Sequence, residues 1–262
     1  QLVTMVTIRH DLTSGQGRAD LDVPGLRFTE SLQPDDLTYL ADGVVQLVRG
    51  TVEGEGQITW NGSDVESSGT FRTDDLDLAA AFGPVKSLSG EIVFTDLLGL
   101  TTAPGQVLEI GAVNPGVEVL GGQVVYAMEG RTLIEVEQGR WPFMGGQLIL
   151  RPVDIAFDSD GEQAYVFEII GLDAAAFVAQ MEIDNIDASG IFDGTIPIIF
   201  DADGNGEIRG GLLISRPPGG NVAYLGELTY EDMGAIANFA FQSLRSLDYR
   251  QMSVELEGSV SG

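Results

Sequence analysis

The stretch Gln123-Val-Val-Tyr-Ala-Met-Glu-Gly-Arg-Thr-Leu-Ile-Glu-Val136 indicates the fold class of this chain. Val124, Tyr126 and Met128 stand two residues apart, so an extended strand places all three side chains on one face. A Glu-Gly pair then interrupts the alternation, as turn residues do, and the pattern resumes at Ile134. The stretch therefore predicts a β-hairpin with one apolar face.

The same alternation recurs along most of the sequence. Apolar residues two positions apart form short runs, and clusters of Gly, Asp and Asn separate one run from the next. The 35 glycines are spread as turn residues, which is typical of a many-stranded antiparallel protein and not of a helical bundle. Residues 11–43 are less regular. Alternation alone fits two architectures, a closed barrel or sandwich and a long, curved open sheet with an exposed apolar face.

Three segments carry helical signals. Asp173 is a candidate N-cap for a short helix that ends near Met181. Residues 76–83 fit a short helical turn. A longer helix is predicted from Tyr230 to Leu247, where apolar residues recur at helical spacing. This longer helix either caps the end of an apolar surface, docks on a partner, or packs on the sheet edge and protects it from aggregation.

The charge balance limits what the chain binds. Its 40 acidic residues against 13 basic ones give a formal net charge of −27. Nucleic acid binding is excluded, because neutralising phosphates requires a basic face. Docking on an anionic membrane surface is disfavoured for the same reason. The sequence has no apolar run of about 18 residues, so we expect no membrane-spanning helix.

The residue types that catalysis needs are scarce. Cysteine is absent and His10 is the only histidine. No nucleophile motif accompanies His10, so we expect it at the surface or the rim of the sheet. Neighbouring carboxylates such as Asp74-Asp75 arise by chance among so many acids. The sequence therefore predicts neither an enzyme nor a cofactor.

Two short motifs leave alternatives open. Asp201, Asp203 and Asn205 occupy the first, third and fifth positions of a calcium-loop pattern, but Leu212 stands where a bidentate Glu is needed. The alternative is an ordinary hairpin turn. In Arg140-Trp-Pro-Phe-Met144, the bulky side chains either line an exposed apolar wall or partner interface, or belong to a core.

Residues 85–257 resemble a known family. Leu97-Leu-Gly-Leu-Thr-Thr102 and Arg140-Trp-Pro-Phe-Met-Gly-Gly146 are long, uncommon strings, and Gly171-Leu-Asp-Ala-Ala-Ala-Phe177 and Asp193-Gly-Thr-Ile-Pro-Ile198 follow them. This region is similar to the C-terminal region of the YdbH-type proteins, which also carry the name dicarboxylate transport. They are grouped with the AsmA-like and TamB-like proteins. The resemblance is weak before residue 85.

The resemblance implies a periplasmic protein of Gram-negative bacteria, anchored in the inner membrane by an N-terminal helix outside this chain. It implies transport of phospholipid to the outer membrane along a repeating β-groove. The partners would be phospholipid acyl chains and, in the full-length protein, partners at both membranes. The chain would be one continuous unit, with an N-terminal portion at residues 1–84 and the C-terminal region at residues 85–262.

Alternation and resemblance together predict a mainly all-β fold, an elongated, curved, open antiparallel β-sheet with one or two short helices. Two other functions remain open, a structural β-domain with a calcium site and a dicarboxylate-binding module, which would need converging arginines. The residues predicted to line the lipid groove are Val124, Tyr126, Met128, Ile134, Val136, Leu148, Leu150, Ile155, Phe157, Phe167, Ile169, Ile196, Ile198, Phe200, Ile208, Leu212, Ile214, Met252, Val254 and Leu256.

Overall fold

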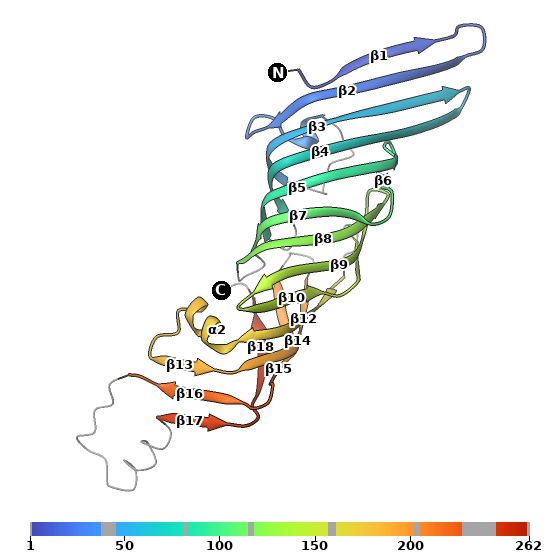
Figure 1. The fold of residues 1–262 in the computed structure, drawn as a ribbon. Helices are drawn as coiled ribbons and strands as arrows, with labels where there is room; N and C mark the ends of the chain where they lie inside the picture. Colours follow the sequence, from blue (N-terminus) through green and yellow to red (C-terminus); the bar gives the residue numbers. More distant parts are fainter. Residues whose placement is uncertain are drawn as a thin grey trace, which may run out of the picture.

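A computed structural model describes residues 2–37, 46–80, 83–114, 118–156, 161–201, 205–226 and 245–260. Its main body is one large antiparallel sheet of 15 strands that does not close. Figure 1 shows a long, curved stack of strands, with β1 at one end and α2 and a small second sheet at the other. The predicted fold class is confirmed, and the closed barrel or sandwich is excluded.

The elements have the following bounds. The large sheet contains β1 (Met5–His10), β2 (Gln16–Phe28), β3 (Gln46–Asn61), β4 (Asp64–Ala80), β5 (Gly83–Asp96), β6 (Thr101–Thr102), β7 (Gln106–Val113), β8 (Val119–Glu129), β9 (Leu133–Phe143), β10 (Gly146–Leu150), β11 (Val153–Ala156), β12 (Gln163–Asp173), β14 (Ile191–Phe200), β15 (Gly206–Ser215) and β18 (Ser253–Ser259). The small sheet contains β13 (Ile186–Ser189), β16 (Gly220–Tyr224) and β17 (Ser246–Tyr249). The helices are α1 (Pro34–Leu37) and α2 (Ala174–Gln180).

Most strands pair with a close neighbour in the sequence. The order in the large sheet is β1-β2-β3-β4-β5-β7-β8-β9-β10-β12-β14-β15-β18, while β6 pairs with β5 and β11 with β9. Within the described segments, β1 and β18 are therefore the two edges of the large sheet. The small sheet has the order β13-β16-β17. Along the chain, β13 lies between β12 and β14, and β16 and β17 lie between β15 and β18, so each excursion begins and ends in the large sheet.

Burial along the strands is one-sided. In β15, Gly211, Leu213 and Ser215 are buried while the residues between them are exposed. The alternation follows from the pleat, which points successive side chains to opposite faces. Buried side chains gather in three clusters along the sheet, around Trp141 and Leu150, around Ile169 and Phe192, and around Val48 and Leu76.

The short helix predicted after Asp173 is confirmed. The Asp173 carboxylate accepts hydrogen bonds from the backbone N–H groups of Ala175 (2.8 Å) and Ala176 (3.2 Å), which is the geometry of an N-cap. α2 ends at Gln180, with Met181 as its C-cap. Within the described residues, neither helix is long and apolar enough to cross a bilayer.

The other two helical predictions fare differently. The helical turn at residues 76–83 is wrong, because β4 continues to Ala80 and Leu76 pairs with Gly50 and Leu88 in the ladder. The sheet pairing outweighs a weak local preference. The helix from Tyr230 to Leu247 falls mostly outside the described residues. Its predicted end is wrong, since Ser246–Tyr249 forms β17.

An ion pair fixes the junction between the two sheets. Arg216, which follows β15, donates to both carboxylate oxygens of Asp193 in β14 at 2.6 Å. The Gly171 N–H also donates to Asp193, at 2.8 Å. The bond from Arg216 lowers the pKa of Asp193 below its ordinary value. The segment that leads from β15 to the small sheet is therefore tied to β14, near the β18 edge of the large sheet.

Candidate functional site

One face of the large sheet carries an uninterrupted row of apolar residues and glycines, and we call it the apolar face. In the ladder, each residue of the row pairs with or lies over the next, from one strand to its neighbour. The row contains Phe28, Gly50, Leu76, Leu88, Ile110, Gly122, Trp141, Leu148, Ile169, Gly194, Leu213 and Val254. With strands about 4.8 Å apart, the row extends for roughly 50 Å.

The adjacent row faces the other way and is mostly polar, so we call this side the polar face. Its registered residues are Ser89, Glu109, Gln123, Arg140, Ile149, Glu168, Thr195, Leu212 and Glu255. The two rows are one residue apart along each strand. The two faces of the sheet therefore differ in polarity, and Glu109, Glu168 and Glu255 lie on the polar face.

The apolar face carries little polarity. The buried polar side chains are neutral, and each makes a hydrogen bond; they are Ser67, Thr73, Thr102, Gln106 and Ser215. Burial raises the pKa of Tyr126 and of Tyr165 above the ordinary tyrosine value, so both phenols stay neutral. Such a surface suits a hydrocarbon ligand and offers little to a charged one.

Most of the residues predicted to line the groove lie on the apolar face. Five are buried: Tyr126, Val136, Leu150, Ile169 and Ile198. The half-buried ones are Val124, Met128, Ile134, Leu148, Ile155, Phe167, Ile196, Phe200, Ile208, Met252, Val254 and Leu256. Phe157 lies outside the described residues.

Leu212 and Ile214 do not join the others. They pair with Thr195 and Asp193 on the polar face and are 39% and 43% exposed. Leu213 takes the place on the apolar face instead, at 6% exposed. A bulge between Ile208 and Gly211 shifts the register and exchanges the faces beyond it. The Gly-Gly pair in this strand was the available signal.

Glycines give the apolar face its second feature, which the sequence pattern did not reveal. Trp141 lies flat across two of them, because a Cβ on Gly122 would stand 2.0 Å from its ring and one on Gly139 would stand 2.4 Å away. Only glycine leaves room for the indole there. Trp141 is 6% exposed and belongs to the central buried cluster. Of the two alternatives for this motif, the structure therefore supports the core for Trp141.

Trp60 repeats the arrangement near the β1 edge. Its ring covers Gly17, where a Cβ would stand 2.1 Å from the ring, and reaches His10 on the edge strand. The Trp60 N–H donates to Nδ1 of His10 at 3.2 Å, and the two rings stack with centroids 5.9 Å apart. His10 is exposed, as predicted for a residue at the rim.

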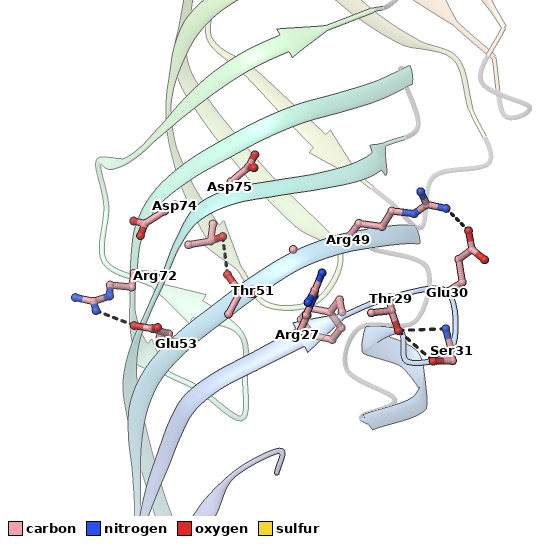
Figure 2. A pocket seen from close by; sticks show the side chains of 13 residues that line it. Arg27, Thr29, Glu30, Ser31, Arg49, Thr51, Glu53, Arg72, Asp74 and Asp75 are labelled. Carbon is pink, nitrogen blue, oxygen red and sulfur yellow. Dashed lines mark hydrogen bonds and ion pairs between the residues drawn. The ribbon is translucent and has the colours of Figure 1, made fainter. Parts of the chain in front are cut away.

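A large hollow lined mostly by polar residues lies beside β2, β3 and β4. It has a volume of about 760 Å³, and its lining includes Arg27, Arg49 and Arg72. Figure 2 shows Arg49 and Arg72 pointing in opposite directions, each paired with a glutamate. Asp74 and Asp75 add further negative charge to the lining. The arginines do not converge on one point, so the hollow gives no support to a dicarboxylate site.

The calcium motif forms a turn in its described part. The backbone N–H and the side-chain amide of Asn205 both donate to the Asp201 carboxylate, at 2.8 Å and 3.0 Å. Asp203 lies outside the described residues. Across the described segments, no three histidine or carboxylate side chains gather closely enough to hold a metal ion. The described contacts are those of a hairpin turn.

A comparison with protein families finds a match over nearly the whole chain. The family model described as YdbH-like, intermembrane phospholipid transport protein YdbH, matches residues 3–262. The chain belongs to this family. No curated protein and no solved structure matches the sequence. The match to the YdbH-like family confirms the predicted resemblance and extends it over residues 3–84, where the sequence strings alone resemble the family only weakly.

Membership of the YdbH-like family supports a role in lipid transport between membranes. The family is one of transport proteins, which agrees with the scarcity of catalytic residue types in the sequence.

Proposed function

We propose that this chain is a non-enzymatic segment of an intermembrane phospholipid carrier whose apolar face is the wall of a groove for acyl chains. One observation carries the proposal, the unbroken apolar row from Phe28 to Val254. None of the twelve members of the row is exposed, since six are buried and six are half-buried. The row is therefore a sheltered apolar surface, and hydrocarbon suits it because hydrocarbon makes no polar demands.

The energetics favour passage along the row over tight binding. Each buried CH₂ contributes about 0.8 kcal/mol relative to water, so both chains of a lipid are held against escape into water. Between neighbouring positions on a uniform apolar surface, the free energy changes little. The lipid can therefore slide, while its head group stays in water at the open side of the sheet.

The same proposal places the segment in the periplasm of a Gram-negative cell, in a protein anchored to the inner membrane. There it supports the lipid supply of the outer membrane. Support comes from the name of the family and from the strongly acidic surface, which disfavours direct docking on anionic lipid. The whole chain acts as one unit in this proposal, because the apolar row crosses from residues 1–84 into residues 85–262.

Photocrosslinking at adjacent residues tests the proposal. A benzophenone amino acid replaces Leu148 on the apolar face in one variant and Gln147 on the polar face in the other. Each protein is illuminated with phosphatidylcholine vesicles and examined by mass spectrometry. We expect lipid adducts at position 148 and few at position 147. Equal adducts at the two positions, or none at position 148, would contradict a lipid-binding apolar face.

A further inference from the structure

One buried polar atom on the apolar face has no partner. Among the buried side-chain nitrogens and oxygens of the described residues, Nε1 of Trp141 is the one without a hydrogen bond. Leaving a buried N–H unpaired is costly, and such groups are rare in folded proteins. The atom lies in the row that the proposed function assigns to acyl chains. A ligand on this face is therefore the natural source of its acceptor.

The surroundings of Trp141 limit the chemistry of that acceptor. Its cluster contains Val85, Ile110, Val136 and Leu150, and these buried neighbours are all aliphatic. A phosphate or carboxylate placed there would lose its hydration without gaining a counter-ion, at a cost of several kcal/mol. A neutral oxygen needs only one donor. The acceptor is therefore uncharged.

The nearest cation along the strand faces the other way. Arg140 precedes Trp141, pairs with Gln123 on the polar face and donates to Gln147 at 3.3 Å. It is exposed and belongs to the row on the polar face, one residue along the strand from Trp141. The positive charge next to Trp141 in the sequence is thus held on the opposite side of the sheet, which again favours a neutral ligand group.

We propose that the Trp141 N–H donates to the ester carbonyl oxygen of a fatty-acyl chain bound on the apolar face. This inference rests on the proposed function. The carbonyl is the neutral acceptor that an acyl lipid carries at the head of its hydrocarbon chain. The apolar face otherwise offers no preferred position to a hydrocarbon chain. This bond fixes one, with the ester near Trp141 and the methylenes along the row.

Binding requires a local rearrangement. Nε1 of Trp141 is buried and closed to water. The side chains of Val124, Leu148 and Phe167 pack against its cluster and are only half-buried. An acyl chain replaces their contacts with its own as it enters, so the carbonyl reaches the N–H without exposing the cluster to water.

A matched pair of lipids tests the hydrogen bond. Diacyl phosphatidylcholine and the dialkyl ether analogue with the same chains compete against a fluorescent fatty-chain probe on the purified chain. The ether lacks only the carbonyl oxygens. Since a neutral hydrogen bond is worth about 0.5–1.5 kcal/mol net, we expect the ester lipid to bind roughly 2- to 12-fold more tightly. A free fatty acid serves as a third competitor and should bind less well than the ester.

The Trp141→Phe variant keeps an aromatic ring and removes the donor, and Trp60→Phe is the matched control. We expect Trp141→Phe to abolish the preference for ester over ether, and Trp60→Phe to retain the preference. Equal binding of both lipids by the wild type would overturn the inference and leave the proposed function standing. Failure of the wild type to bind either lipid would overturn both.

A spectroscopic experiment covers the case in which Trp141→Phe does not fold. The chain has two tryptophans, so a proton–nitrogen correlation spectrum contains two indole signals. We expect the diacyl lipid to move the Trp141 indole proton downfield relative to its position with the ether analogue, and to leave Trp60 unchanged. Identical Trp141 signals with the two bound lipids would contradict the proposed bond.

Discussion

The regions around Trp141 and Trp60 use the same arrangement with different results. In both, an indole lies flat over glycine on the apolar face. Trp60 lies near the edge of the sheet, is half-buried and gives its N–H to His10. Trp141 lies in the middle of the sheet, is buried and has no protein acceptor. At the edge the indole N–H has a protein acceptor, whereas in the central region the indole N–H has none.

This difference separates stability from function. A tryptophan whose polar atom is satisfied contributes packing and nothing more. A tryptophan that contributes to the core while leaving an N–H unpaired carries a cost, and a ligand that removes the cost gains affinity. The comparison therefore identifies the central region as the place where the apolar face distinguishes one hydrocarbon ligand from another.

Replacing each tryptophan by alanine should give the largest contrast. Trp141→Ala leaves a cavity in the central cluster, and we expect a loss of about 3–5 kcal/mol in the free energy of unfolding. Trp60→Ala removes a half-buried ring, and water can fill the space it leaves, so no cavity remains. We expect a loss of about 1–2 kcal/mol in the free energy of unfolding. Urea unfolding of the two variants measures the difference. Similar losses at both sites would show that the edge ring is as tightly packed as the central one.

Adding a methyl group beneath each ring should give the next largest effect. Gly139→Ala places a Cβ 2.4 Å from the Trp141 ring and 3.1 Å from Cβ of Leu150, and both of these side chains are buried. We expect a loss of about 1–3 kcal/mol from overpacking. Gly17→Ala meets only the half-exposed Trp60 ring, which can swing outward, so we expect less than about 1 kcal/mol. Thermal unfolding of both variants checks the order.

Acid should weaken the ion pair between Arg216 and Asp193, which joins the two sheets on the Trp141 side of the molecule and not at the β1 edge. The bond from Arg216 lowers the pKa of Asp193, so the stability from this pair is present above the unfolded value of about 3.9 and is lost as pH falls through the folded pKa. Because the pair is partly exposed and screened, Asp193→Asn should cost about 0.5–1 kcal/mol at pH 7. The cost should shrink as the pH falls below about 3.9 and through the lower folded pKa.

Asp11 supplies the control at the opposite end of the sheet. Its carboxylate accepts the Thr13 N–H at 2.7 Å, which lowers its pKa, but no cation pairs with it at that site. Asp11→Asn should therefore cost less than Asp193→Asn at pH 7. Urea unfolding across the pH range compares the two. A cost for Asp193→Asn that persists unchanged in acid would mean that the charge of Asp193 is not what stabilises the junction.

Removing the acceptor at the edge should have the smallest effect. His10→Ala leaves the Trp60 N–H without its protein partner, but water is available to it at the exposed rim, so we expect a loss below about 0.5 kcal/mol. The emission of Trp60, recorded in a Trp141→Phe background, should shift to longer wavelength. A loss as large as that of Trp60→Ala would mean that the histidine is structurally required.

Much of the fold followed from local pattern. The alternation around Tyr126 predicted strands, and the Asp173 cap predicted α2, because both depend on residues within a few positions of each other. β2 (Gln16–Phe28) was missed, since it lies in the less regular stretch and its register shifts between Val23 and Leu26. A bulge breaks the period of two that identifies a strand.

Within the candidate site, the sequence alone determined that most strands have one apolar face, because a period of two can be recognised within one strand without knowing which strands pair with it. The tertiary structure decided which face each strand presents after a bulge, as Leu213 and Ile214 illustrate. It also decided that the sheet stays open and that Trp141 lies over glycines of its own and the neighbouring strand. Those outcomes depend on register between strands, and register is set by contacts that no local pattern contains.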